Sequence, residues 1–175
     1  MDLNGYIACI CEGSAEQAIM ELLLDDNKLI FTSEQLLEEE IIRNRSAKEF
    51  EQRYLRKGFN DKITVLRILD SRKENFNLSK AYKDKVAVID VITAPEIEML
   101  IIFNEDKYED FKKSKMKPSE FCKIKLKFKS VKNYTFVKDY FSDTNKLFKS
   151  IHEYRRVSNI KKGEYTLFDL LKLTN

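Results

Sequence analysis

Short apolar runs alternate with longer stretches of helical spacing along roughly the first hundred residues. Residues 5–11, 61–72 and 86–92 are short runs rich in apolar and β-branched side chains, which is typical of buried strands. Residues 27–31 form a shorter run of the same kind. Because helical segments separate these runs, the pattern predicts a parallel sheet with helices on both faces. The expected fold class is therefore α/β.

Capping signals mark where the helices between these strands are expected to begin. The expected starts are at Ser14, with Gln17 three residues later, at Thr32 or Ser33, and at Ser46, with Glu49 three residues later. Gly58 is a natural end for the helix that begins at Ser46, and Pro95 suits the first turn of a further helix. The sequence therefore predicts a helix after the first strand, two more before residue 61, and one after residue 94.

The pattern changes beyond Phe103. In residues 120–131, lysines alternate as in a strand, whereas the apolar side chains have helical spacing, and the longer apolar face favours a helix. Residues 134–141, 145–157 and 164–172 also have helical patterns, and the aromatic residues of the first of these segments are expected in the core. We therefore expect a core over residues 1–106 and a mainly helical extension over residues 107–175 that packs on it.

Charge divides the chain at the same place. Residues 1–106 carry 14 Lys and Arg against 21 Asp and Glu, whereas residues 107–175 carry 18 against 8. A basic half can gather a polyanion such as nucleic acid, although lysine-rich surfaces also serve solubility. The candidate nucleic-acid contacts are Lys123, Lys125, Lys127, Arg155 and Arg156. The alternative for these side chains is a solvated surface.

Several classes of protein are disfavoured. No apolar run approaches the roughly 20 residues of a membrane span, and the N-terminus has no basic, apolar leader, so we expect a cytoplasmic protein without membrane association. Cys9, Cys11 and Cys122 have no metal-site spacing and are expected to be reduced core thiols. The single histidine, His152, is expected to be exposed or to serve packing. The glycines form no phosphate-binding loop.

Two acidic residues stand where predicted strands end. Glu12 follows the first strand and Asp70 closes the third, and ligands of parallel α/β sheets bind beyond the carboxyl ends of strands. Carboxylates that converge there suit Mg²⁺ or Mn²⁺. The competing interpretation is structural, with Glu12 favouring the next helix dipole and Asp70 capping a loop. Asp90 lies inside its strand, which favours a buried, hydrogen-bonded structural role.

These residues carry a resemblance to a known family. The strand, Glu-Gly and helix of "ICEGSAEQAI" and the strand ending in Asp of "VLRILDSR" resemble the two acidic motifs of the Toprim fold, which topoisomerases, primases and several nucleases share. The segment "APEIEMLIIF" resembles a helix of small RloB-like Toprim-related proteins associated with phage defence, and Glu98 is its matching acid. The likeness covers roughly residues 5–103. It implies metal-assisted phosphodiester cleavage or transfer on nucleic acid.

The chain departs from the Toprim pattern at one position. Arg72 stands where the family usually has a second Asp, so Glu98 or Glu74 would supply the missing carboxylate and Arg72 would contact phosphate. The resemblance thus implies a nuclease in which Glu12 and Asp70 hold Mg²⁺ or Mn²⁺ and Glu98 is a further ligand or water-positioning base. The alternative is a non-catalytic module of a defence or mobile-element system that binds nucleic acid, DNA or RNA, or a partner protein.

Overall fold

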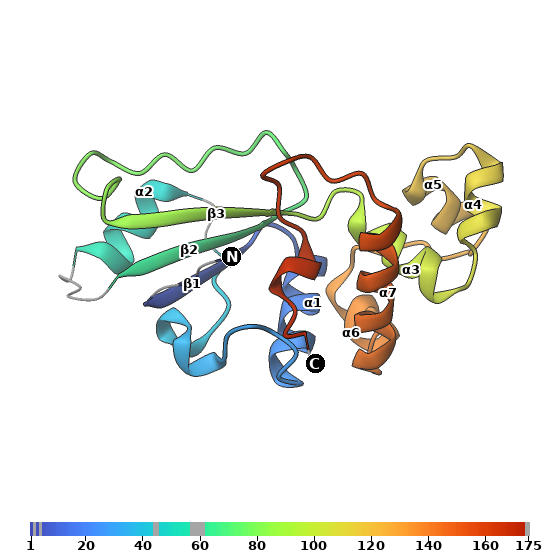
Figure 1. The fold of residues 1–175 in the computed structure, drawn as a ribbon, viewed down its shortest axis with the longest axis horizontal. Coiled ribbons are helices and arrows are strands. Elements are labelled where there is room, and N and C mark those ends of the chain that lie inside the picture. The colour runs from blue at the N-terminus through green and yellow to red at the C-terminus, as the bar shows by residue number, and fades with distance from the viewer. Residues whose placement is uncertain (2, 4, 44–45, 57–61, 174–175) are drawn as a thin grey trace.

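The computed structural model describes residues 1, 3, 5–43, 46–56 and 62–173. Its centre is a parallel sheet of β1 (Tyr6–Cys11), β2 (Ile63–Leu69) and β3 (Val86–Ile92), in that order across the sheet (Figure 1). The predictions of an α/β fold and of these three strands are confirmed. The central strand, β2, is buried along its whole length, as expected for a strand with neighbours on both sides.

Helices account for most of the remaining regular structure. They are α1 (Ser14–Asp25), α2 (Ala47–Phe50), α3 (Glu96–Asn104), α4 (Tyr108–Ser114), α5 (Pro118–Ile124), α6 (Tyr134–Tyr140) and α7 (Thr144–Val157). A π-helical turn, Glu51–Leu55, continues α2. The predicted helices over 134–141 and 145–157 are therefore confirmed.

Side chains alternate along each strand, so neighbouring residues of β2 point to opposite faces of the sheet. Each face packs against its own hydrophobic core. On one face, Leu66 and Ile68 of β2 belong to the larger hydrophobic core with α1 and α3. On the other face, Ile63 and Val65 pack with Phe50 of α2 in a smaller core. Two separate apolar layers therefore hold the sheet, as the predicted arrangement requires.

The second half of the chain shares the larger core. Helix α6 packs on α1, while α5 and α7 pack on α3. Phe121 of α5, Phe141 after α6 and Ile151 of α7 are all buried there. By contrast, α4 has no buried residue, and α4 and α5 lie at the end of the molecule farthest from the sheet (Figure 1). None of the described helices combines the length and the apolar character needed to cross a membrane.

The predicted strand over residues 27–31 is wrong. Leu29 forms only an isolated bridge, to Leu171, and the Ile30 N–H donates to the Leu170 carbonyl. The apolar run therefore binds the C-terminal segment, and Leu29 and Phe31 are buried there without joining the sheet. A hydrophobic pattern alone does not distinguish a buried segment with one isolated bridge from a strand of the sheet.

The prediction of a helix beginning at Thr32 or Ser33 is also wrong. The segment forms two 3₁₀ turns, Ser33–Gln35 and Leu37–Glu39, and Glu38 has a positive φ of 59°, which interrupts helical geometry. Leu36 and Ile42 form parallel bridges to residues of β1. The segment therefore follows the outer edge of β1 and partly satisfies its backbone groups.

Two helices expected in the basic half are shorter than predicted. In residues 120–131, α5 ends at Ile124, and the Phe128 N–H donates to the carbonyl of Cys122 as the chain turns back. Phe128 and Val131 thus reach the core from an irregular segment rather than from a helical face. Over residues 164–172, only the 3₁₀ turn Leu167–Leu170 forms.

The helix starts agree only in part with the capping prediction. Ser46 accepts a hydrogen bond from the Glu49 N–H at 3.3 Å, as expected. Helix α1 begins at Ser14, as expected, but its N-cap residue is Gly13 rather than Ser14. Pro95 is the N-cap of α3 rather than a residue of its first turn. Gly58 lies outside the described residues.

Structural roles predicted for other polar groups are mostly confirmed. The three cysteines are reduced and buried, and His152 packs between the rings of Phe148 and Phe168. Asp90 pairs with Arg67 at 3.1 Å, which confirms its structural hydrogen bond. The expected burial of Asp90 is wrong, because β3 is an edge strand and leaves this side chain 43% exposed.

Candidate functional site

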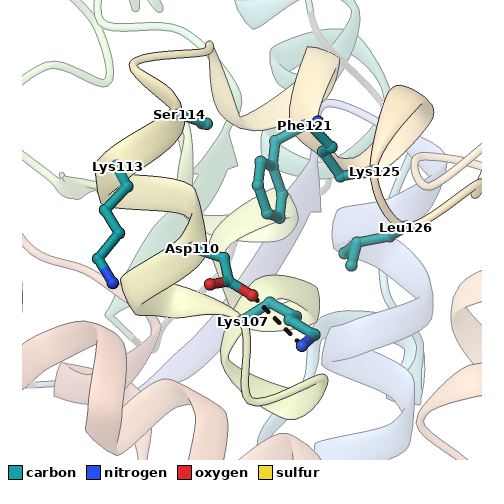
Figure 2. Close-up of a pocket in the computed structure, with 7 residues that line it drawn as sticks. All are labelled: Lys107, Asp110, Lys113, Ser114, Phe121, Lys125 and Leu126. Carbon is teal, nitrogen blue, oxygen red and sulfur yellow. Dashed lines mark ion pairs between the residues drawn. The ribbon is translucent and has the colours of Figure 1, made fainter.

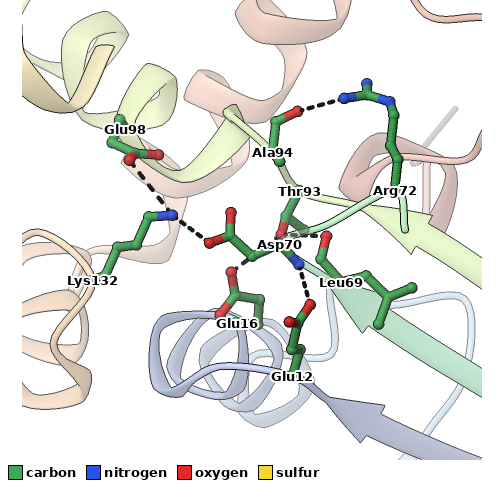
Figure 3. A network of polar contacts seen from close by, with 9 residues as sticks. All are labelled: Glu12, Glu16, Leu69, Asp70, Arg72, Thr93, Ala94, Glu98 and Lys132. Carbon is green, nitrogen blue, oxygen red and sulfur yellow. Dashed lines mark hydrogen bonds and ion pairs between the residues drawn. The ribbon is translucent and has the colours of Figure 1, made fainter. Parts of the chain in front are cut away.

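The first two strands bring their terminal acids together. Glu12 follows the last residue of β1, and Asp70 follows the last residue of β2, which is the neighbouring strand. A Glu12 carboxylate oxygen accepts a hydrogen bond from the Asp70 backbone N–H at 2.9 Å (Figure 3). The predicted pairing of these two residues at one edge of the sheet is therefore present.

A lysine from the basic half enters the same place. The Lys132 ammonium lies 2.5 Å from a carboxylate oxygen of Asp70 and 3.6 Å from one of Glu98 (Figure 3). Asp70 comes from the end of β2 and Glu98 from the first turn of α3, so a single cation joins two elements of the fold. Because one ammonium contacts both carboxylates, Glu98 lies beside Asp70 at this edge of the sheet.

Glu98 is the least solvated of these groups. The residue is 5% exposed, and its Oε2 atom is buried with no hydrogen-bond partner among the residues that the structure describes. Leaving a buried carboxylate oxygen unpaired is costly. The Glu98 carboxylate is therefore only partly satisfied by Lys132 and retains capacity for a further cation or donor.

A fourth carboxylate, that of Glu16, is buried close to Asp70. It is 2% exposed and lies 3.2 Å from the Thr93 hydroxyl. Burial raises the pKa of Glu16, and the nearby charge of Asp70 raises it further. For Lys132, burial lowers the pKa, but the hydrogen bond to Asp70 and the charge of Glu98 outweigh this and leave it above its ordinary value. The ammonium is thus firmly charged. We call Glu12, Glu16, Asp70, Glu98 and Lys132 the acid cluster.

Sequence reasoning missed two members of the acid cluster. Glu16 looks like an ordinary first-turn acid that favours the helix dipole. Lys132 is one of many lysines in its region and lies in an irregular segment, where no periodicity indicates its direction. The only sequence signal for Glu16 is its place one turn after Glu12, on the helix that follows the acidic strand end.

Arg72 and Glu74 do not complete the cluster. The Arg72 guanidinium donates to Glu164 at 2.9 Å and to the Ala94 carbonyl at 3.2 Å, and its side chain points away from Asp70 (Figure 3). The hydrogen bond to Glu164 raises the pKa of Arg72. Glu74 is exposed on the segment between β2 and β3. The predicted phosphate contact of Arg72 would therefore require its exchange from Glu164.

The carboxylates of the acid cluster are the type of ligand that Mg²⁺ and Mn²⁺ prefer. Within the described ranges, no group of three or more His, Cys, Asp or Glu side chains is arranged to hold a metal ion. The oxygens of Asp70 and Glu98 are nevertheless hard ligands, they already share one cation, and Glu98 Oε2 is unpaired. The cluster therefore offers two carboxylate ligands of the right chemistry, and an ion bound to both would have to replace the Lys132 ammonium.

Two of the predicted nucleic-acid contacts line different hollows. Lys123 lines a groove of about 700 Å³ beside Glu98 and Lys132. Lys125 instead lines a cavity of about 460 Å³ between α4 and α5, where Lys107 pairs with Asp110 at 3.3 Å (Figure 2). Of these two hollows, the groove of Lys123 adjoins the acid cluster and the cavity of Lys125 does not.

The other predicted contacts are not part of that groove. Lys127 lies in the turn after α5 with a positive φ of 64°. Arg155 packs over Phe168 and lies 3.6 Å from Asp169, and Arg156 pairs with Glu153 on the same helix. The two arginines therefore already have acidic partners within the protein.

Comparison with protein-family models, with curated proteins and with solved structures finds no match to this chain.

Proposed function

We propose that the protein is a Toprim-like, metal-dependent enzyme that cleaves phosphodiesters of nucleic acid. The observation that carries the proposal is the sharing of one cation by Asp70 and Glu98, at the edge where Glu12 binds the Asp70 backbone. Active sites of parallel α/β proteins lie beyond this edge. The order of the three acids along the chain, from strand end to strand end to helix, is that of the family the sequence resembles.

Asp70 and Glu98 would hold the divalent ion, with Glu12 fixing the backbone position of Asp70. Bound there, Mg²⁺ or Mn²⁺ supplies charge neutralisation for phosphate oxygens and a more acidic water. The Glu98 carboxylate, which has one unpaired oxygen, is suited to position a water molecule. The displaced Lys132 ammonium would remain close by and bind the substrate phosphate.

Lys132 thus has two roles in the proposal. Without a ligand, its ammonium compensates the carboxylates, which would otherwise repel one another across the cluster. With metal and substrate bound, the ion would compensate the carboxylates and the Lys132 ammonium would pair with a phosphate of the substrate. Each charged group of the site would then have a partner of opposite charge. This exchange explains how one site can hold a lysine and still bind a divalent ion.

Cleavage assays with Mg²⁺ or Mn²⁺ test the proposal. Glu98→Gln preserves size but removes the charge, and should lower cleavage of labelled DNA or RNA by about a hundredfold or more. Glu12→Ala removes the oxygen that accepts the Asp70 backbone N–H, and should also lower cleavage. The matched control is Glu34→Gln, since Glu34 is exposed and lies outside both the acid cluster and the groove beside Glu98, and its cleavage rate should stay close to that of the unmodified protein.

A second candidate function is non-catalytic binding of nucleic acid in a defence or mobile-element system. The observation that favours it is the neutralisation of Asp70 and Glu98 by Lys132 without an ion. If the purified protein cleaves neither DNA nor RNA with either metal, and Glu98→Gln does not change nucleic-acid affinity, the enzyme proposal is wrong and the binding module replaces it.

A further inference from the structure

The groove next to the acid cluster is the feature that extends the proposed function furthest. It has a volume of about 700 Å³ and lies between α5 and the irregular segment that follows it. Glu98 and Lys132 belong both to the groove and to the acid cluster. A molecule in the groove would therefore lie directly against the carboxylates. The cavity of Lys125 contains no residue of the acid cluster and lacks this connection.

One wall of the groove is positively charged. Lys123 and Lys129 line it together with Lys132, and both are exposed. Among the residues that the structure describes, neither Lys123 nor Lys129 forms an ion pair, in contrast to Lys107 and Lys138 elsewhere in this half. These two ammonium groups are therefore available to phosphates. The groove also carries the hydroxyls of its two serines, Ser119 and Ser130.

Beside the lysines, and beside the carboxylates of Glu98 and Glu120, the groove has an apolar part. Ile124 is 43% exposed, and Phe128 and Val131 lie beside it, so the three side chains form a continuous apolar patch. Phe128 is held by ring contacts with Phe136 and Tyr140, at centroid distances of 5.5 and 5.6 Å. This packing gives the apolar surface a rigid position next to the lysines.

Lysines beside a fixed apolar surface match the two sides of a nucleotide chain. A single strand offers both phosphates and unstacked bases, whereas a duplex presents its phosphates and keeps its bases stacked inside. A volume in the range of ordinary ligand pockets, roughly 300–1,000 Å³, holds a few nucleotides at most. An apolar surface in such a groove would be of little use to a double helix.

We propose that this groove binds a short stretch of single-stranded nucleic acid and delivers its phosphodiester to the acid cluster. Lys123 and Lys129 bind phosphates, and Ile124 with Phe128 contacts a base. This inference rests on the proposed function for the cleavage step, but the binding itself is independent of metal. It defines the substrate class of the site as single-stranded.

Binding measured by fluorescence anisotropy, in EDTA so that no cleavage occurs, tests the inference. The probes are a labelled mixed-sequence single strand, as DNA and as RNA, and the duplex of the same sequence. We expect at least one single strand to bind about tenfold more tightly than the duplex. Ile124→Ser should weaken single-strand binding by about fivefold and leave duplex binding unchanged.

Lys123→Gln/Lys129→Gln should weaken single-strand binding by about tenfold and lower the slope of log affinity against log salt by about 0.7 for each lysine removed. The matched control is Lys161→Gln/Lys162→Gln, which removes the same charge from exposed lysines that do not line the groove. Equal losses in the two double variants would overturn the inference, because they would show binding by overall charge.

The outcomes separate this inference from the proposed function. Equal affinity for single strand and duplex would contradict the proposed role of the groove. If the protein nevertheless cleaved a duplex with Mg²⁺ or Mn²⁺, the enzyme proposal would still hold. Single-strand binding that depends on Ile124, Lys123 and Lys129, without any cleavage by Mg²⁺ or Mn²⁺, would confirm the groove and overturn the enzyme. Binding to neither nucleic acid would contradict the groove assignment directly.

Discussion

At the scale of single residues, two buried charged groups differ in how completely they are paired. Arg67 is 4% exposed and is compensated by Asp90, and the ring of Phe76 lies under its guanidinium. Glu98 is buried to a similar degree but keeps one oxygen unpaired. An unpaired buried carboxylate oxygen lowers the free energy of unfolding. The arrangement of Glu98 is therefore more consistent with a role in binding a ligand than with a role in stabilising the fold.

Glu96 gives a prediction on pH and stability. It is fully buried, and burial raises its pKa from an ordinary value of 4.5 to about 8. Between these values the folded protein keeps a proton that the unfolded chain has lost, so the free energy of unfolding should fall as pH rises from about 5 to about 8. Glu96→Gln cannot ionise, so it should flatten this fall and be the more stable protein at pH 8.

Urea denaturation at several pH values measures this effect, which we expect to be a few kcal/mol at most. Glu120→Gln is the control, because the exposed Glu120 should not change the pH profile. Parallel pH profiles for Glu96→Gln and the unmodified protein would show that Glu96 does not hold its proton in the folded state.

At the scale of elements, the acid cluster depends on the register between β1 and β2. Tyr6 pairs with Ile63 and Cys11 with Ile68, so Glu12 follows directly opposite the end of β2. A shift by one residue would turn every side chain of β1 to the other face and separate Glu12 from the Asp70 backbone. The start of β1 is therefore as important for the site as its end.

Gly5 fixes that start. It has a positive φ of 73°, and a Cβ there would overlap the Lys62 carbonyl, which accepts the Tyr6 N–H at 3.0 Å. Gly5→Ala should therefore lower the free energy of unfolding by about 2 kcal/mol or more. Gly163→Ala is the matched control, since Gly163 also has a positive φ, 89°, but a Cβ added there would have no atom within 4 Å. This substitution should lower the free energy of unfolding by about 1 kcal/mol. Equal losses in urea denaturation would show that the Lys62 contact is unimportant.

The part of the fold that sequence predicts is the part set by local patterns. Apolar runs identify β1, β2 and β3, and each acidic residue after a run marks a strand end, which is why Glu12 and Asp70 could be found. The edge segment around Leu36 could not, because its shape is set by bridges to β1 rather than by its own spacing. Lys132 was missed for the same reason, since its position depends on how the chain turns after α5.

At the scale of the whole molecule, the two halves have opposite charge and meet at the acid cluster. The acidic half supplies the carboxylates at the carboxyl edge of the sheet, and the basic half supplies Lys132 and the lysines of the groove. Helices of both halves share one core, so the position of Lys132 relative to Asp70 is held by packing. The charge division in the sequence is thus the division between the two sides of the candidate site.

The central claim is that the acid cluster binds a divalent cation in exchange for the Lys132 ammonium. Mn²⁺ binding measured by calorimetry on the unmodified protein and on Lys132→Met tests it most directly, with Lys129→Met as a control that removes an exposed lysine of the same groove. Removing the internal competitor should make Mn²⁺ bind about tenfold more tightly in Lys132→Met and leave the affinity of Lys129→Met little changed. Weaker or equal Mn²⁺ binding in a folded Lys132→Met protein would contradict the claim.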